Sequence, residues 1–460
     1  MIDASLLLLV AALAAAPCDS SVRWRRLGQI FVCKPETETR SVVFLLSGDD
    51  GWTEMMQQIA DQLTAEGALV VGVQTPTFLK QLNAAKEKCA YPAADFETLS
   101  QYLQKKLGLP EYLEPLLIGF SSGAALTYAI AEQAPAHIFK GVVGLGFYAE
   151  LSTGKPWCSE HGLLRLDKSG KHAHLEPDPK GKFPWRVIQG QEDKICDPLK
   201  AEAFVKGVST GRFVSVPGQG HTLTTAFLPP VMEAVHELVG APSVHPPPSD
   251  PEVSDLPIVE VPAEGGEHSD TLAVIVSGDG GWASIDKEVA AELAKHGVAS
   301  VGLNSLKYFW SPRSPESTTK DVERILQHYS VAWKRPRVAL VGYSFGADIL
   351  PFVFNRLRDD VRSKVELVAL LAPTNMAEFE FHLSDWVGGE SDTALPTAPE
   401  ISKIAGTRVL CVQGGEEETA ACTSLRKTQG KTERLPGGHH FDGDYVGLAA
   451  RILAELKTAP

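Results

Sequence analysis

The chain has 460 residues, of which 44% are hydrophobic and 22% charged, and its formal net charge is −14. This length exceeds what one hydrophobic core supports, so we expect about two to four domains of ordinary globular composition. The acidic balance disfavours non-specific binding to nucleic acid, and no nucleic-acid partner is expected. An acidic protein remains suited to a cationic substrate.

The N-terminus resembles a secretory signal. Met1–Ala16 holds a short apolar run whose end fits an A-x-A cleavage pattern. Asp3 stands where a basic residue is usual, and Pro17 follows the cleavage point. The run is shorter than the roughly 20 apolar residues that span a bilayer. We predict a signal peptide over 1–16 and a periplasmic protein, peripheral to the inner membrane.

The seven cysteines show no C-x-x-C pair and no Cys/His cluster with zinc spacing, so no metal and no cofactor are expected. In an exported protein cysteines can pair, and Cys411 with Cys422 would tie a strand to the loop beyond it. The state of the remaining five stays open between pairing and free burial. They are Cys18, Cys33, Cys89, Cys158 and Cys196.

Four sequence blocks occur twice in the same order. The pairs are Leu45–Val73 with Ile275–Leu303, Leu116–Ile130 with Ala339–Val353, Arg186–Lys200 with Arg408–Arg426, and Ser215–His221 with Arg434–His440. This repetition predicts a duplicated module of about 200 residues, a usual size for one domain. We assign 17–240 and 263–460 to the two modules, and 241–262, which is rich in proline and acid, to a linker.

Within the second module, apolar runs alternate with amphipathic stretches. Strands are predicted at Val274–Val276, Val298–Leu303, Val338–Val341, Val365–Leu371 and Val409–Val412, and helices at Ser284–Lys295 and Lys320–Tyr329. Such alternation is typical of a parallel sheet covered by helices on both faces. The predicted fold class is α/β, with two tandem domains that each hold a mostly parallel sheet. Ligands of such sheets bind beyond the carboxyl ends of the strands.

A candidate nucleophile follows the strand at Val338–Val341. The next five residues, Gly342-Tyr343-Ser344-Phe345-Gly346, match G-x-S-x-G and precede a helix-like stretch. On such a turn the serine hydroxyl projects clear of the sheet, the glycines remove clashes, and the helix N-terminus offers N–H groups to an oxyanion. The pattern is common by chance, but here it has its strand–turn–helix context and is repeated around Ser121. We predict Ser344 as the nucleophile.

A serine nucleophile needs a base, and two histidines follow an apolar-to-glycine turn late in the module. His440 aligns with His221 of the first module, so we predict His440 as the base and give His439 a structural or rim role. The order serine, acid, histidine is that of α/β-hydrolases.

The acid is expected on the loop after the strand at Val409–Val412. Glu416, Glu417 and Glu418 stand there. Counted from the preceding glycine, Glu417 or Glu418 matches Asp193 of the first module, and the choice between them stays open. A glutamate can orient an imidazole as an aspartate does.

Glycine-rich Ser277–Trp282 ends the first strong strand, so its backbone can approach a substrate carbonyl. We assign the N–H groups of Asp279 and Phe345 to an oxyanion hole. The residues predicted to contact the substrate are Gly280, Trp282, Tyr308, Trp310, Asp348 and Asp385. The competing interpretation is core packing for the aromatic residues and a structural hydrogen bond for Asp348. Asp385 is also an out-of-register alternative for the acid.

Ser121, Asp193 and His221 give the first module a candidate second triad. In this module Tyr91–Ala93 replace the aromatic segment near the cleft, and GDDGW replaces GDGGW. We favour a substrate-docking or structural role for it, because one copy of a duplicated module is free to change while the fold persists.

The second module resembles the family of the bacterial virulence proteins VirJ and AcvB. The segments VIVSGDGGW, LKYFWSPRSPE, VALVGYSFGADILP and LPGGHHFDGDY carry the resemblance and cover most of Thr271–Leu456. The two-module layout is similar to the longer, AcvB-like members. The resemblance implies an exported α/β-hydrolase with Ser344 as nucleophile and His440 as base, and for AcvB-like members hydrolysis of lysyl-phosphatidylglycerol. For VirJ-like members it implies association with type IV secretion substrates.

The residues suit that chemistry, because an aminoacyl ester is an activated acyl compound open to serine attack. Glu378, Glu380 and Asp385 near the cleft would favour a lysyl group. We therefore expect a serine hydrolase that acts on an aminoacylated phospholipid at the membrane surface. The competing function is a non-catalytic periplasmic adaptor that binds secretion substrates.

Overall fold

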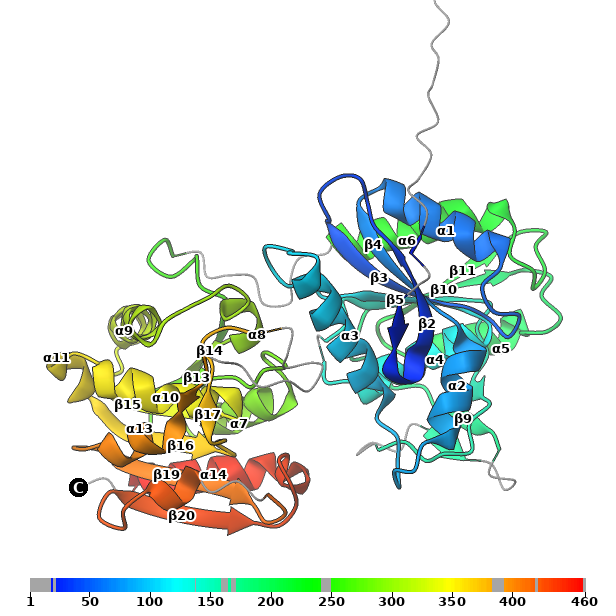
Figure 1. Ribbon diagram of the computed structural model, residues 1–460. Coiled ribbons are helices and arrows are strands. Elements are labelled where there is room, and N and C mark those ends of the chain that lie inside the picture. The colour runs from blue at the N-terminus through cyan, green and yellow to red at the C-terminus, as the bar shows by residue number, and fades with distance from the viewer. Residues whose placement is uncertain are drawn as a thin grey trace, which may run out of the picture. The chain divides into compact units, whose positions relative to one another are not determined.

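The structure is a computed structural model, and the residues that it describes fall into two compact units (Figure 1). The first unit lies within 1–99, 113–134 and 139–240, and the second within 100–112, 135–138 and 241–460. The predicted signal peptide, Glu418 and Asp385 lie outside the described residues. The described residues are 18–19, 22–136, 138–158, 164–166, 171–240, 250–382, 393–417 and 421–457.

The main sheet of the first unit has eight strands among the described residues, in the order β1-β2-β4-β3-β5-β6-β10-β11. These are β1 (Arg23–Trp24), β2 (Gly28–Cys33), β3 (Ser41–Leu46), β4 (Ala68–Val73), β5 (Leu116–Phe120), β6 (Gly141–Leu145), β10 (Trp185–Gly190) and β11 (Gly211–Val216). β1 and β2 pair antiparallel, as do β2 and β4, and the other neighbours are parallel. A small sheet holds β7 (Glu150–Leu151), β9 (Ala173–Leu175) and β8 (Leu164–Leu166).

Helices connect the parallel strands of the first unit, as parallel pairing requires. They are α1 (Glu54–Ala65), α2 (Thr75–Ala84), α4 (Ser122–Gln133), α5 (Pro198–Lys206) and α6 (Leu228–Gly240), with the 3-10 helices η1 (Arg25–Leu27) and η2 (Thr225–Phe227). A further helix, α3 (Pro92–Lys106), begins in the first unit, and its residues from 100 onward cluster with the second. The N-cap Thr53 starts α1 by accepting a hydrogen bond from the N–H of Met56.

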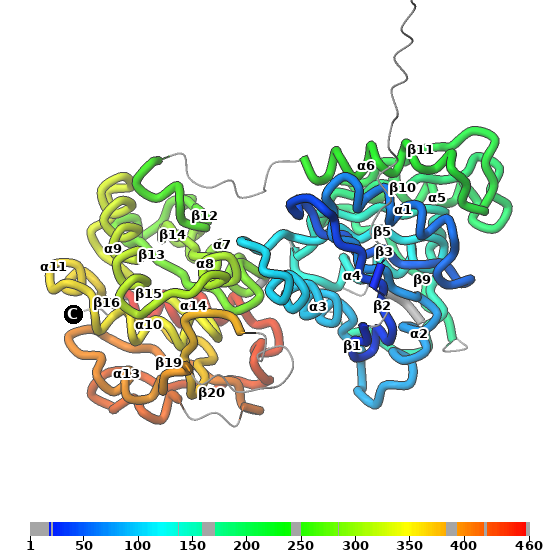
Figure 2. Tube along the Cα trace, turned by 45° about the horizontal axis from the view of Figure 1, so that its top comes forward, coloured from blue at the N-terminus to red at the C-terminus, as the bar shows by residue number. Residues whose placement is uncertain are grey.

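The second unit repeats this sheet in the order β12-β14-β13-β15-β16-β19-β20. Its strands are β12 (Ile258–Val261), β13 (Thr271–Val276), β14 (Ala299–Leu303), β15 (Arg337–Tyr343), β16 (Val365–Leu371), β19 (Arg408–Gly414) and β20 (Gly430–Leu435). Only the edge pair β12–β14 is antiparallel among these described strands. Figure 2 follows the chain through this unit from green to red. The predicted α/β class, with two mostly parallel sheets, is confirmed.

The helices of the second unit cover both faces of its sheet. They are α7 (Ser284–Lys295), α8 (Ser305–Tyr308), α9 (Pro315–Ala332), α10 (Phe345–Arg356), α11 (Asp359–Arg362), α13 (Thr397–Lys403) and α14 (Tyr445–Lys457), with η3 (Ala421–Ser424) and η4 (Phe441–Gly443). A short ribbon pairs β17 (Met376–Ala377) with β18 (Leu395–Pro396).

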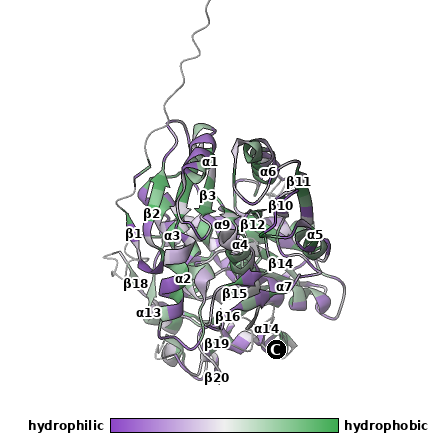
Figure 3. Ribbon diagram, turned by 90° about the vertical axis from the view of Figure 1, so that its right-hand side faces the viewer, coloured by the Kyte–Doolittle hydropathy of each residue, from purple (hydrophilic) through white to green (hydrophobic). Residues whose placement is uncertain are grey.

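Alternate residues of the central strands enter opposite cores, as the period of a strand requires. In β13, Val274 and Val276 join the cluster under α9 and α10, whereas Ile275 joins the cluster under α7 and α14. A strand with both faces buried must be apolar throughout, and Figure 3 shows strands such as β3 coloured as hydrophobic. These two cores hold the strand ends, and therefore the loops beyond them, in place.

Three disulfides join Cys18 with Cys33, Cys89 with Cys158, and Cys411 with Cys422. The expected pairing of Cys411 with Cys422 is confirmed, and Cys196 is a free, buried thiol. Among the described residues, no helix is both long and apolar enough to cross a membrane.

Part of the predicted linker 241–262 is a strand. Ile258–Val261 forms β12 at the edge of the second sheet, with Ile258 and Val259 buried. Pro257 just before it is compatible with a strand start at a sheet edge. The segments 100–112 and 135–138, placed in the first module by the repeat, cluster with the second unit.

Candidate active site

Ser344 sits on a strained turn between β15 and α10. Its φ of 51° and ψ of −118° lie in a region that L-residues rarely adopt. The Ser344 N–H donates to the carbonyl of Leu371 on the neighbouring strand β16 (2.8 Å), and its carbonyl accepts from Ala347 in the first turn of α10. The turn is held from both sides, so the hydroxyl stands at the carboxyl end of the sheet.

The glycines of G-x-S-x-G are required by close backbone approaches. A Cβ on Gly342 would lie 2.5 Å from the carbonyl oxygen of Gly346, and one on Gly346 would lie 2.0 Å from that of Val276 in β13. Any side chain at either position would push α10 away from the sheet. The sequence argument for these glycines therefore agrees with the structure.

His439 and Glu417 complete a hydrogen-bonded series with Ser344. His439 Nε2 lies 2.7 Å from Ser344 Oγ, and His439 Nδ1 lies 2.5 Å from Glu417 Oε1. The other carboxylate oxygen of Glu417 accepts the N–H of Gly414 at 2.8 Å. This is the arrangement in which an imidazole takes the serine proton and a carboxylate fixes its tautomer.

The prediction that His440 is the base is wrong in position. The His440 ring turns away, and its Nδ1 lies 3.0 Å from the Tyr343 hydroxyl. The error came from aligning the repeat without a gap: His221 stands five residues after Val216, the end of β11, whereas His439 stands four after Leu435, the end of β20. The histidine loop, the segment between the last sheet strand and the histidine, is one residue shorter in the second unit (436–438) than in the first (217–220). The first of the two histidines of the second unit therefore reaches the serine.

Of the two candidate acids Glu417 and Glu418, the structure brings Glu417 to the imidazole. Glu418 and the alternative Asp385 lie outside the described residues. Glu416 points elsewhere: it is exposed, and its carboxylate lies beside Gly438.

The glycine-rich loop lies against the nucleophile, as predicted. A Cβ on Gly278 would be 3.7 Å from Ser344 Cβ, so Asp279 and Gly280 follow directly beside the serine. Ser277 holds the loop: its hydroxyl accepts from the Ser305 N–H (2.9 Å), and its carbonyl accepts from the Ser305 hydroxyl (2.6 Å). Phe345 is the first residue of α10, where a helix leaves its N–H groups without partners in the preceding turn. These positions suit the predicted oxyanion donors, Asp279 and Phe345.

Trp282 does not line the site, contrary to the prediction. It is 6% exposed and lies flat on β14, where a Cβ on Gly302 would be 2.1 Å from its ring. The first unit repeats the arrangement with Trp52 over Gly72. This tryptophan fills the space that a strand glycine leaves, and therefore packs the core.

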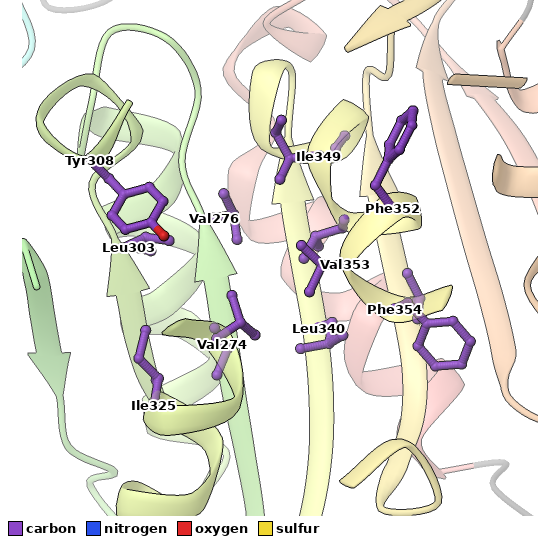
Figure 4. Packing of buried hydrophobic residues seen from close by; sticks show 14 of the residues in the cluster. Val274, Val276, Leu303, Tyr308, Ile325, Leu340, Ile349, Phe352, Val353 and Phe354 are labelled. Carbon is purple, nitrogen blue, oxygen red and sulfur yellow. The ribbon is translucent and has the colours of Figure 1, made fainter. Parts of the chain in front are cut away.

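Tyr308 and Trp310 also belong to the core rather than to the substrate cleft. Tyr308 is 1% exposed and donates its hydroxyl to Asp321 (2.6 Å), and Figure 4 shows it beside Leu303 in the apolar cluster. Trp310 is 3% exposed and joins the same cluster. The sequence of an aromatic run does not show whether its rings face the core or the cleft. In this structure the rings of Tyr308 and Trp310 face the core.

Asp348 makes structural hydrogen bonds. It is 3% exposed, and its two carboxylate oxygens accept the N–H and the hydroxyl of Thr374 at 2.6 and 2.7 Å. Burial raises the pKa of Asp348 to about 8, and the bonds from Thr374 oppose this. Since Thr374 follows β16, the contact ties α10 to the neighbouring strand. The prediction of substrate contact is replaced by this role.

A buried polar group beneath the site was not anticipated. The Tyr343 hydroxyl oxygen lies 3.0 Å from His440 Nδ1 and 3.3 Å from the carbonyl oxygen of His439. Nearby Asp286 is 2% exposed, accepts the N–H of Ala283, and keeps one oxygen without a hydrogen-bond partner among the described protein atoms. Burial raises the pKa of Asp286 to about 8. The repeat could have flagged both, because the first module has Met56 and Phe120 at these positions.

The first unit holds its own series at the equivalent place. His221 Nε2 lies 3.1 Å from Ser121 Oγ, and His221 Nδ1 lies 2.9 Å from Asp193 Oδ2. The residues of the candidate second triad are thus brought together.

Two groups of side chains among the described residues place possible metal ligands within 4.8 Å of one another. One is Asp193 and His221 with Cys196, which overlaps the first series. The other, Asp250, Glu252 and His328, lies at the surface, where a Glu252 carboxylate oxygen is 3.2 Å from His328 Nδ1. Neither group involves Ser344.

Three exposed carboxylates surround the second site. Asp279 stands on the glycine loop, Glu416 beside the histidine loop, and Asp442 beside Gly437. The nearby Arg434 guanidinium donates to backbone carbonyls of Gly415 and Glu417. The loops around the site, 277–282, 414–417 and 436–442, therefore carry exposed carboxylates and no lysine or arginine.

Solved structures with this fold match the chain at low identity. Est1E from Butyrivibrio proteoclasticus is 11% identical with a TM-score of 0.33, covering 44% of this chain and 94% of that one. The esterase domain of a Rhodothermus marinus protein is 18% identical with a TM-score of 0.31, covering 45% and 91%. Proline iminopeptidase from Mycobacterium smegmatis is 11% identical with a TM-score of 0.32, covering 44% and 95%. These likenesses concern the fold alone, and no curated protein matches the chain.

A family match covers more than half of the chain. The model of the family described as bacterial virulence protein (VirJ) matches residues 40–171 and 270–460. The first range holds the Ser121 turn, and the second holds Ser344, Glu417 and His439. Since this match covers more than half of the chain, the chain belongs to the VirJ family of bacterial virulence proteins.

Proposed function

We propose that the chain is an exported serine hydrolase that uses Ser344 to cleave the aminoacyl ester of a membrane lipid of the lysyl-phosphatidylglycerol type. The observation that carries the proposal is the hydrogen-bonded series Ser344–His439–Glu417 on a strained strand-to-helix turn. A serine in such a series is activated for attack on an acyl carbon.

The geometry supports a two-step acyl transfer. Ser344 Oγ bonds to the ester carbon while its proton passes to His439 Nε2, and Glu417 stabilises the imidazolium. We assign the N–H groups of Asp279 and Phe345 to the oxyanion. The ester C–O bond then breaks, and the lipid alcohol leaves with the proton from His439. Water, deprotonated by His439, releases the lysyl group from Ser344 as free lysine.

The charge around the mouth favours a cationic acyl group. Lysyl-phosphatidylglycerol carries two ammonium groups against one phosphate, whereas the phosphatidylglycerol product keeps only the phosphate. The exposed carboxylates of Asp279, Glu416 and Asp442 would attract the substrate and repel that product. This attraction should weaken as salt screens the exposed charges.

The disulfides support the exported location that the N-terminal sequence predicts. Three cysteine pairs are bonded among the described residues, including Cys411–Cys422 directly behind the acid loop. Disulfides persist in oxidising compartments such as the periplasm and are rare in the cytosol.

Lysine release from vesicles that contain lysyl-phosphatidylglycerol tests the proposal. The wild-type chain should release lysine, and Ser344→Ala should lose at least about a thousandfold in rate. A second arm uses p-nitrophenyl acetate, which is a neutral ester. Turnover of that ester through Ser344 without lysine release would keep the hydrolase and reject the lipid substrate. Equal lysine release by wild type and Ser344→Ala would reject the serine mechanism.

A further inference from the structure

We propose that the first unit holds a second, independent hydrolytic centre, Ser121–His221–Asp193, which acts on carboxylic esters. The nucleophile turn is the first observation. Ser121 has φ 54° and ψ −118°, nearly the same strained values as Ser344, and its N–H donates to the carbonyl of Leu145 at 2.8 Å. Such a strained turn persists only where the surrounding structure enforces it.

The glycine loop of the first unit is kept as well. A Cβ on Gly48 would lie 3.3 Å from Ser121 Cβ, and one on Gly123 would lie 2.5 Å from the carbonyl oxygen of Ser47. The backbone therefore approaches the serine as closely as in the second unit. Ser122 starts α4, so its N–H is placed as an oxyanion donor.

The acid of this centre is held by more donors than Glu417. Asp193 Oδ1 accepts the N–H groups of Ile195 (2.9 Å) and Cys196 (2.8 Å), and Oδ2 accepts the side-chain amide of Gln189 (3.0 Å) as well as facing His221. Asp193 is 4% exposed. These donors hold the carboxylate in place, so that Oδ2 faces His221 Nδ1 and the other ring nitrogen, Nε2, points toward Ser121.

A purely structural unit would not need this arrangement. Burying a carboxylate beside an imidazole costs free energy that apolar packing would avoid, and holding Ser121 at positive φ adds strain. A copy that had lost its chemistry could replace Asp193, His221 or Ser121 without loss of core packing. All three are present, and their atoms lie at hydrogen-bonding distances.

The residues next to the serine of this centre differ from those next to Ser344 in the second unit. The residue after the nucleophile is Ser122, 2% exposed, whereas in the second unit it is Phe345, whose ring packs against Phe309 and Phe381. The Cys196 thiol hydrogen-bonds with Ser121, and burial raises the pKa of this thiol to about 12, so it is uncharged at neutral pH. Ser122 thus stands where the second unit has the Phe345 ring, whereas Phe120 lies against His221 with ring centroids 5.1 Å apart.

Metal binding by Asp193, Cys196 and His221 is the competing use of these side chains. Oδ1 of Asp193 already accepts two N–H donors, and Oδ2 accepts the Gln189 amide and faces His221, so their lone pairs are already engaged. The set therefore fits a hydrogen-bonded triad better than an ion site.

The reaction is a balanced acyl transfer. A bond forms between Ser121 Oγ and the ester carbon, and the serine proton moves to His221 Nε2. The ester C–O bond breaks, and the alcohol leaves with that proton. Water then adds to the acyl carbon, gives a proton to His221, and frees the carboxylic acid as Ser121 recovers its hydrogen.

Covalent labelling of the full chain by a fluorophosphonate tests the second centre. We expect two additions per chain in the intact mass, with peptide mapping that places one on Ser121 and one on Ser344. Ser121→Ala and Ser344→Ala should each remove one addition, and the double variant both. Labelling should be the same with and without EDTA. Mapping of the wild-type chain requires no variant to fold.

Turnover of a neutral ester supplies the second readout. In a Ser344→Ala background we expect turnover of p-nitrophenyl acetate, and a loss of at least about a hundredfold on adding His221→Ala. A wild-type chain labelled only at Ser344, or labelling of Ser121 that appears only with EDTA, would overturn the second centre. Neither result would bear on Ser344, because its label is mapped separately.

Discussion

Two adjacent histidines take different positions around Ser344. His439 joins the serine to Glu417, and His440 faces the Tyr343 hydroxyl. Only the first can receive the serine proton, because that step needs an imidazole nitrogen within hydrogen-bonding reach of the hydroxyl. The two side chains differ in function although they differ by one position in the sequence.

Replacing each histidine separates these positions. In a Ser121→Ala background, His439→Ala should lower kcat for p-nitrophenyl acetate by at least about a thousandfold, because no base then reaches Ser344. His440→Ala should lower it by less than about tenfold. Steady-state kinetics gives both values, and a larger loss in His440→Ala than in His439→Ala would contradict the assignment.

Glu417 orients His439 and stabilises its charged form. In the same background, Glu417→Gln should therefore reduce kcat by about a hundredfold or more with little change in KM. Glu416→Gln is the matched control: Glu416 is exposed, one position away, and its loss should leave turnover of the neutral ester intact. Equal effects of the two substitutions would remove Glu417 from the series.

Asp286 makes stability depend on pH. Its pKa rises from 3.8 to about 8 on burial, so the folded chain holds a proton that the unfolded chain releases. Its contribution to stability is full below about pH 4 and is lost as pH rises toward 8, because the unfolded state binds fewer protons in that window. Asp286→Asn should therefore be more stable than wild type at pH 7, with a difference that shrinks toward pH 4.

Thermal unfolding at a series of pH values measures this difference. Each unit of difference between the folded and the unfolded pKa corresponds to about 1.4 kcal/mol of unfolding free energy. Thermal unfolding should therefore resolve the effect readily. A difference between Asp286→Asn and wild type that stays constant from pH 4 to pH 8 would contradict the account.

At the scale of elements, the site depends on how closely α10 approaches β13. Gly346→Ala would place a methyl group 2.0 Å from the Val276 carbonyl oxygen, and backbone on both sides cannot yield without moving the serine. We expect Gly346→Ala to lower the unfolding free energy by at least about 2 kcal/mol and to abolish most of the activity. Gly240→Ala, with no atom within 4 Å of the added Cβ, is the control, measured by the same denaturant titration.

The repeated elements explain what could be predicted from sequence. The strands, the helices and both nucleophile turns follow from local patterns, and the duplicated blocks show which patterns matter. The base was misassigned because a one-residue difference between the loops after β11 and β20 is invisible in an ungapped comparison. Pairing with the neighbouring strands fixes the ends of β11 and β20, and only then does the count to each histidine become clear.

The sequence also does not show which side chains face the core and which face the site. Trp282, Tyr308 and Trp310 stand near the site in sequence, yet all are at most 6% exposed. The glycine in the next strand, Gly302, carried the missing signal, because it leaves room for the Trp282 ring. For Tyr308 and Trp310 we find no such signal in the sequence, since inward and outward aromatic rings have the same pattern.

For the whole molecule, the duplication supplies two sites with different surroundings. The second is bordered by exposed carboxylates and aromatic rings, and the first by Ser122 and the Cys196 thiol. An adaptor that only bound secretion substrates would need neither an activated serine nor the strain at Ser344 and Ser121. The chemistry of the serines therefore separates an enzyme from a binding protein.

Labelling of Ser344 in the folded chain tests the central claim most directly. A fluorophosphonate should add covalently to Ser344 in Ser121→Ala, and the adduct should be absent in Ser121→Ala with His439→Ala over the same time, because the hydroxyl then lacks its base. Mass spectrometry of the peptide that carries Ser344 gives the result. A folded Ser121→Ala chain that shows no adduct on Ser344 would contradict the account.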